Sequence, residues 1–211
     1  FANPMLTPLI QGFTLGASLI IAIGSQNAFV LRQGLRKEYV FTICSICFLC
    51  DALLILLGVG GFGTLVASSE GLMLTACWGG ALFLFVYGVK SFRSALKAEA
   101  MEVDPSDQPA SGLTWAIATT LALTLLNPHV YLDTVILLGS IAGQFPENQR
   151  SSFAIGAVCA SMLWFYGLGY GSRILAPLFL KKIAWKILDI LIGVVMWAIA
   201  GSLLWPVLVA V

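Results

Sequence analysis

Two aspartates stand inside long apolar stretches of the sequence, where a charged side chain is costly if the chain crosses a membrane. Asp51 lies twelve residues beyond Tyr39, about 18 Å at the helical rise and thus near the middle of a ~30 Å hydrocarbon core. Asp133 lies at a similar depth in a later stretch. A charge there costs at least ~2.5 kcal/mol, so each carboxyl group should face a cavity or a partner.

These carboxyl groups have two interpretations. Each can join helices as a protonated or hydrogen-bonded group. Alternatively, each can bind a cation and exchange a proton, because burial raises the pKa of a carboxyl group and a nearby cation lowers it. His129 and Asp133 are four residues apart, so they share a helix face and could form a pair. As the sole histidine, His129 fits either a hydrogen-bonded wall residue or a proton relay.

Two polar breaks interrupt apolar segments at residues 24–27 and 127–129, about a hundred residues apart. Pro128 lacks a backbone N–H and clashes with the preceding turn, and Asn127 is well suited to cap the helix that resumes. At the first break, Gly24 and Ser25 only permit unwinding. Each break alone could be a packing kink. Matched breaks in two halves instead predict a substrate site between repeats, as in secondary transporters.

Helix N-termini at such breaks point into the protein and favour an anion, such as the carboxylate of an amino acid. Gln26 and Asn27 lie at the first of these N-termini, and Asn127 lies at the second. Arg32 follows the first break by a few residues. It is expected either to extend to the membrane surface or to contact a substrate carboxylate.

Composition places the whole chain in a bilayer. Of its 211 residues 59% are hydrophobic and only 10% are charged, whereas a soluble domain carries about 25% charged residues. The formal net charge of +1 and the absence of a basic run argue against a nucleic-acid partner. We predict an all-α polytopic fold with six transmembrane helices, at about 6–31, 40–67, 71–92, 114–142, 152–175 and 184–208.

The basic residues predict how these helices are oriented. All of them except Arg150 follow the first, third or fifth span. They are Arg32, Arg36 and Lys37; Lys90, Arg93 and Lys97; and Arg173, Lys181, Lys182 and Lys186. Since cytoplasmic loops carry the Lys/Arg excess, these three loops should be cytoplasmic and both termini outside. The alternative is a re-entrant first span, which gives five spans and a cytoplasmic N-terminus. No cleaved signal peptide is expected, because no basic residue precedes the first apolar stretch.

Residues 98–112 have the composition of a solvated linker, with four acids and two prolines. They divide the chain into a first repeat, residues 1–97, and a second repeat, residues 113–211. Each repeat has three predicted spans, and the first and fourth helices are the broken ones. An odd number of spans per repeat makes the second repeat enter the membrane upside down, so we expect an inverted-repeat arrangement.

The five cysteines do not form a cofactor site in the sequence. Cys44, Cys47 and Cys50 begin an iron–sulfur spacing, but the fourth ligand with its Cys-Pro context is absent. Cys77 and Cys159 are isolated in other spans, so all five are predicted to be small buried side chains. No P-loop, metal-ligand cluster or nucleophile triad is present. We therefore expect neither an enzyme nor a cofactor or metal.

Five segments together resemble the LysE family of basic amino-acid exporters, in order along nearly the whole chain. They are residues 24–30, residues 33–34, Asp51, residues 78–80 and residues 126–134. The stretch from Asn127 to Thr134 is most similar to the arginine-exporter branch, and Tyr131 within it is a further candidate site residue. One departure is Ser25, where the family usually has proline.

The resemblance implies secondary active export of L-arginine, with lysine or canavanine as further cargo. Export would cross the bacterial inner membrane, driven by the proton gradient. In the resulting hypothesis of alternating access, Gln26, Asn27 and Asn127 hold the α-carboxylate. Asp51 and Asp133 hold the cationic end and exchange protons. The alternatives are export of a neutral amino acid or a metal cation, an intramembrane redox enzyme and a structural scaffold. The oligomeric state stays open, a homodimer included.

Overall fold

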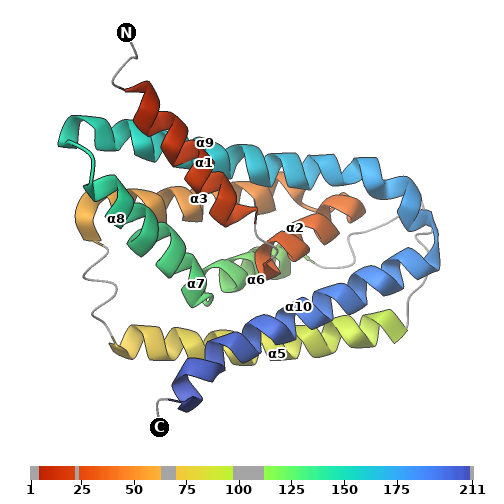
Figure 1. Cartoon of the computed structure of the whole chain (residues 1–211). Coiled ribbons are helices and arrows are strands. Elements are labelled where there is room, and N and C mark those ends of the chain that lie inside the picture. Colours follow the sequence, from red (N-terminus) through yellow and green to blue (C-terminus); the bar gives the residue numbers. More distant parts are fainter. Residues whose placement is uncertain (1–4, 22–23, 63–69, 97–111, 210–211) are drawn as a thin grey trace.

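The computed structural model describes residues 5–21, 24–62, 70–96 and 112–209, and within these ranges the regular structure is helical throughout (Figure 1). The predicted all-α fold is thus confirmed. The predicted linker, apart from Gly112, lies outside the described residues, and so do residues 22–23 within the first predicted span and residues 63–67 at the end of the second. The side chains of residues 62, 70–77, 128, 180, 203 and 206–209 are also outside the description.

In the first half of the chain, the helices are α1 (Leu6–Ile20), α2 (Ser25–Arg36), α3 (Val40–Leu57), its π-helical continuation η1 (Gly58–Phe62) and α5 (Glu70–Leu96). In the second half they are α6 (Leu113–Leu125), α7 (Pro128–Val130), the π-helix η2 (Tyr131–Leu137), α8 (Leu138–Gly143), α9 (Glu147–Gly171), the 3-10 helix η3 (Ser172–Leu180) and α10 (Lys182–Val209). Both predicted breaks are present, one between α1 and α2 and the other between α6 and α7.

Three helical stretches are long and apolar enough to cross a membrane, namely Val40–Gly61, Glu147–Phe179 and Lys182–Ser202. The pair α1 and α2, bent by 81° at the first break, is a fourth if it counts as one span. Leu113–Leu125 and Tyr131–Gly143 are shorter apolar helices on either side of the second break. The chain is therefore a polytopic helical membrane protein in outline, while the number of six spans stays a prediction.

Close contacts between small residues pack α1 against α9. A Cβ atom added at Gly12 would collide with the backbone carbonyl of Phe153, and one added at Gly16 would lie 3.0 Å from the Cα of Ala157. Gly156 of α9 is equally close to the backbone of α1 at Leu9. Such small residues allow helix backbones in a membrane to approach closely. The first half-helix is thus fixed to the second half of the chain.

The half-helix that follows each break packs on the end of a long helix from the other half of the chain. α2 lies against the junction of α9 and η3, where a Cβ atom at Gly34 would collide with Ser172 and Gly169. Likewise, α8 and η2 lie against η1, where a Cβ atom at Gly139 would lie 2.5 Å from the carbonyl oxygen of Gly58. α5 and α10 form the remaining extensive pair (Figure 1).

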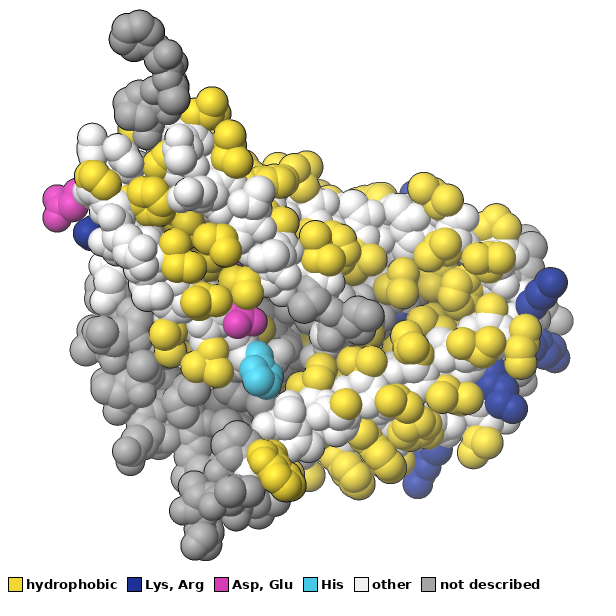
Figure 2. Space-filling view, viewed as in Figure 1, with side chains coloured by type: hydrophobic (Ala, Val, Ile, Leu, Met, Phe, Trp, Pro, Cys, Tyr) yellow, Lys and Arg dark blue, Asp and Glu magenta, His cyan; other side chains and the backbone are white. Residues whose placement is uncertain are grey.

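Charged and apolar side chains separate along the length of the molecule. Figure 2 shows hydrophobic side chains over its sides and a group of Lys and Arg side chains at one end. The exposed apolar side chains include Leu49 and Leu53 on α3 and Leu163 on α9, each more than half exposed. At the basic end, Arg32 of α2 forms an ion pair with the buried Asp189 of α10 at 3.3 Å. This distribution suits a chain with an apolar belt in a bilayer.

Candidate functional site

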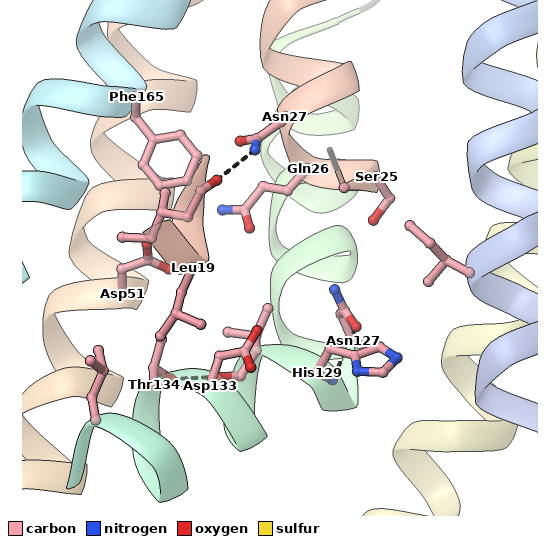
Figure 3. A pocket seen from close by; sticks show the side chains of 15 residues that line it. Leu19, Ser25, Gln26, Asn27, Asp51, Asn127, His129, Asp133, Thr134 and Phe165 are labelled. Carbon is pink, nitrogen blue, oxygen red and sulfur yellow. Dashed lines mark hydrogen bonds between the residues drawn. The ribbon is translucent and has the colours of Figure 1, made fainter. Parts of the chain in front are cut away.

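A cavity of about 260 Å³ lies where the two breaks face each other, and it brings together residues from both halves of the chain. Gln26, Asn27, Asp51, Asn127 and Asp133 all line it. In Figure 3, Ser25 and Gln26 of α2 lie on one side of the cavity, and Asn127 of the second break and Asp133 of η2 lie across it. The volume lies just below the ~300 Å³ at which pockets for drug-sized ligands begin, so it fits a small solute.

The first break is held by contacts between distant parts of the chain. The side-chain nitrogen of Asn27 donates a hydrogen bond to the carbonyl oxygen of Ile20 at 2.7 Å, at the end of α1. The indole nitrogen of Trp164 on α9 donates to the side-chain oxygen of Asn27 at 3.1 Å. Asn27 therefore satisfies a helix-end carbonyl that the break leaves free. It positions α1, α2 and α9 relative to one another as well as lining the cavity.

The N-terminus of α2 opens toward the cavity without a capping side chain. Gly24, the N-cap residue, is extended there (φ −125°, ψ 171°) and provides no side-chain cap. The Ser25 side chain is fully buried, and its hydroxyl has no hydrogen-bond partner among the described residues. Buried polar groups are nearly always hydrogen-bonded, so a buried hydroxyl without a partner beside a cavity indicates a ligand. The N–H groups and the dipole at a helix N-terminus favour an anion at this position.

The second break differs because its helix N-terminus is already capped. The side-chain oxygen of Asn127 accepts a hydrogen bond from the backbone N–H of His129 at 3.2 Å, which confirms the predicted cap. The Tyr131 hydroxyl donates to the carbonyl oxygen of Leu125 at 2.8 Å and so satisfies the end of α6. Pro128 begins α7. All of these contacts are local in sequence.

The two aspartates both reach the cavity but from different surroundings. Asp51 is 3% exposed and accepts a hydrogen bond from the hydroxyl of Ser161 on α9 at 2.9 Å. Asp133 is half-buried on η2, a π-helical segment of the kind that often occurs at functional sites. Because a buried carboxylate needs a compensating partner, a cationic ligand between these groups would be stabilised strongly.

The remaining candidates lie at the edge of this site or outside it. His129 lines the cavity and is exposed, and the described contacts include no hydrogen bond or ion pair between its ring and Asp133. Tyr131 and Arg32 are not among the lining residues. Tyr131 closes the end of α6, and Arg32 pairs with Asp189 and donates to the Ser94 hydroxyl at 3.3 Å. Arg32 therefore extends neither freely to the surface nor into the cavity.

The candidate site residues predicted from the sequence include none of those that α9 contributes. Ser161 bonds to Asp51, Trp164 bonds to Asn27 and Phe165 lines the cavity. These contacts join residues 110 and 137 positions apart, and no local spacing signals them. Asp189 was also missed, although the rule that singled out Asp51 applies to it. It is an acid inside a predicted span.

Cys44 and Cys47 are buried as predicted, Cys50 and Cys159 are half-buried, and all four are free thiols. The side chain of Cys77 is outside the described residues. Within the described ranges, no group of three or more His, Cys, Asp or Glu side chains could hold a metal ion.

Comparisons with known proteins place this chain in a family. Residues 17–206 match the family model described as "LysE type translocator". The chain is 44% identical over 201 residues to a protein of Aeromonas salmonicida named "Putative amino-acid transporter YggA", covering 94% of this chain and 96% of the relative. It is 41% identical to the arginine exporter protein ArgO of Serratia proteamaculans, with 95% and 98% of the two chains covered. For ArgO of Salmonella enteritidis, the identity is 42% and the coverage 94% of both.

No solved structure gives a match. The family model spans most of the chain, and relatives above 40% identity cover nearly all of it. The resemblance seen in the two break motifs is thereby confirmed. The chain belongs to the LysE family of translocators, which are transporters and not enzymes.

Proposed function

We propose that the protein exports basic L-amino acids, L-arginine above all, from the bacterial cytoplasm across the inner membrane. Relatives that match over nearly their full length are named as arginine exporters. Lysine and canavanine share the α-amino-acid group and a cationic end, so they are the expected further cargo. The proposal also rests on the chemistry of the central cavity.

The uncapped N-terminus of α2 is the observation that carries this proposal. Its free amide groups and the fully buried Ser25 hydroxyl suit a carboxylate, and Gln26 beside them is 9% exposed. Asp51 and Asp133 line the same cavity and suit a cation. A basic amino acid is a small molecule with a carboxylate at one end and a cation at the other. A neutral amino acid would leave the aspartates without a partner, and a metal cation would leave the helix N-terminus without one.

The same aspartates are proposed to couple export to protons. A guanidinium group between Asp51 and Asp133 favours their charged forms, whereas an empty cavity favours protonation because a buried carboxylate is poorly solvated. Protons entering from outside would then compete with arginine for the aspartates and release it. His129 at the cavity edge is a candidate to pass protons between Asp133 and solvent.

Alternating access between two inverted repeats, residues 1–97 and 113–211, is proposed as the transport mechanism. The half-helix after each break packs on a long helix of the other repeat, which supports this mechanism. α2 lies on the end of α9, while α8 and η2 lie on the end of α3. Six spans result if each broken helix crosses the membrane once. The basic end of the molecule would face the cytoplasm, with the loops after the first, third and fifth spans there. A homodimer is compatible with the proposal but not required by it.

Transport by purified protein in liposomes tests the proposal. Counterflow of radiolabelled arginine, with lysine, canavanine, threonine and divalent metals as competitors, identifies the cargo. We expect arginine and its cationic analogues to compete and threonine and metals to fail. Competition by threonine or by a metal at the same concentration would instead assign a different cargo.

Proton coupling needs a separate measurement on Asp51→Asn and Asp133→Asn. Transport driven by an imposed pH gradient should be lost in both variants. Equilibrium exchange of arginine separates the roles, because a residue needed only for coupling leaves exchange intact whereas a binding residue abolishes it. Glu147→Gln, at an exposed acid on α9, is the matched control. Gradient-driven transport that persists in both variants would reject the coupling role.

A further inference from the structure

A second cavity, of about 440 Å³, lies at the basic end of the molecule, and the proposed transport site does not include it. α2, α5 and the first turn of α6 enclose it. Three cationic side chains line its wall, Arg32, Arg36 and Lys90, and among the described residues that line it none is acidic. A cavity with this charge selects an anion.

Two buried polar groups at this cavity have no hydrogen-bond partner within the part of the chain that the structure describes. Ser91 of α5 is 1% exposed, and its hydroxyl is without a partner. Gln33 of α2 is 3% exposed, and its amide oxygen is also without one. Since buried polar groups are nearly always paired, both indicate a ligand. A hydroxyl can donate to an anion, whereas an amide oxygen only accepts, so the ligand should carry both an anionic group and a hydroxyl or amine donor.

The charges near the cavity are not fully cancelled by the protein. Asp189 offsets Arg32, at 3.3 Å, and Arg36, which lies over the Trp185 ring, is also near enough to Asp189 and Glu38 to interact with them. For Lys90, on the same wall, the described contacts include no ion pair. Gly112 precedes the first turn of α6, a 13-residue helix whose N-terminus has no capping side chain, so the helix dipole adds to the positive potential.

The position of the cavity favours a lipid over a soluble anion. It lies between helices at the end where Lys and Arg gather (Figure 2). Trp115 on its rim is 39% exposed, and tryptophan is typical of the headgroup level of a membrane. Basic pockets between transmembrane helices are suited to anionic headgroups.

We propose that this cavity binds the headgroup of an anionic phospholipid. The phosphate lies against Arg36, Lys90 and the Ser91 hydroxyl, and a headgroup hydroxyl donates to the amide oxygen of Gln33. Phosphatidylglycerol has both groups, whereas phosphatidic acid lacks the hydroxyl. This site is independent of the cargo carried by the central cavity.

Native mass spectrometry of the detergent-solubilised protein, titrated with phosphatidylglycerol or phosphatidylcholine, tests the site. The double variant Arg36→Gln/Lys90→Gln should lower phosphatidylglycerol affinity about 25-fold, because each cation near a membrane surface contributes about 1 kcal/mol, or about fivefold. Lys182→Gln/Lys186→Gln removes two exposed charges at the same end that do not line the cavity, and it should leave the affinity unchanged. Equal loss in both double variants would overturn the site, and so would equal binding of the two lipids.

Two further measurements fix the chemistry of the ligand. Gln33→Leu should reduce the preference for phosphatidylglycerol over phosphatidic acid, while Ser91→Ala should weaken both lipids without altering the charge. These two single variants also test the lipid site if the double variant fails to fold. Inorganic phosphate should not displace the lipid at millimolar concentration. Displacement would assign the cavity to a soluble anion and overturn the lipid proposal, as would an unchanged preference in Gln33→Leu.

Discussion

The two helix breaks face the same cavity, but they are built in different ways. The second is stabilised by its own sequence, with Pro128 at the start of α7, Asn127 as its cap and Tyr131 on the last carbonyl of α6. The first is stabilised by Asn27 and by Trp164 from α9, while the N-terminus of α2 stays open. At the second break, side chains of the break itself occupy backbone groups at the helix ends, so fewer of these groups are available to a ligand. A break held from a distance can leave its helix end free to bind one.

The largest expected effect is a loss of stability when the ion pair between Arg32, in the C-terminal half of α2, and Asp189 of α10 is broken. Asp189→Asn leaves the half-buried Arg32 without its counter-charge, and breaking a buried ion pair costs about 3 kcal/mol or more. Thermal unfolding in detergent should show a clear decrease in stability. Arg32→Gln/Asp189→Asn should recover part of it, because neither charge is then buried. A double variant less stable than both single variants would contradict this account of the pair.

A carboxylate placed at the open helix end should occupy the proposed anion site. Ser25→Asp is expected to lower arginine affinity about 100-fold, because a hydrogen-bonded charge of this kind is worth roughly 2–3 kcal/mol. The new carboxylate, in the first turn of α2, should also interact favourably with the helix dipole. Arginine-dependent thermal shift and calorimetry measure both effects. Unchanged arginine affinity in this variant would mean that the carboxylate binds elsewhere.

The hydrogen bonds that close the two helix ends can be removed one at a time. Trp164→Phe removes the bond from α9 to Asn27, and we expect a loss of about 1–2 kcal/mol of stability together with weaker arginine binding. Tyr131→Phe removes the local bond to Leu125 and should cost a similar amount without altering arginine binding. Unfolding curves and binding isotherms of the two variants make the comparison. If both variants lose affinity equally, the two breaks do not differ as described.

The smallest effect is expected where this chain departs from its family. Ser25 is the first residue of α2 and follows the extended Gly24, which is the geometry that proline favours at both positions. Ser25→Pro should therefore stabilise the protein by about 0.4–1 kcal/mol. It also removes one N–H and one hydroxyl from the proposed anion site, so arginine affinity should decrease a few-fold. A less stable Ser25→Pro variant would show that the break needs a different backbone geometry.

Much of this structure could be predicted because its signals are local. Pro128 cannot continue a helix, so the second break and the Asn127 cap followed from two neighbouring residues. Asp51 and Asp133 were identified as cavity residues because hydrocarbon penalises a charge wherever the helix carries it. Asp189 carries the same signal in the last predicted span, and its partner there is Arg32.

Other features had no local signal. The π-helical turn that carries Asp133 departs from the regular helix that an apolar stretch predicts. The ion pair of Arg32 joins α2 to α10 across more than 150 residues. The sequence therefore could not decide between a contact of Arg32 with the membrane surface and one with the substrate, and neither is its main contact. The six spans and the inverted repeats remain predictions, because the described helices include three or four clear spans.

The sequence by itself determined that the chain is helical and membrane-embedded, that it is broken twice and that it carries acids at membrane depth. These properties follow from the cost of placing backbone and charge in hydrocarbon. Only the tertiary structure decided that the two breaks and both aspartates share one cavity and that α9 positions Asn27 and Asp51. It also decided that the open helix end belongs to α2. Those facts depend on contacts between side chains that are more than a hundred residues apart in the sequence, and only the packing of the helices determines these contacts.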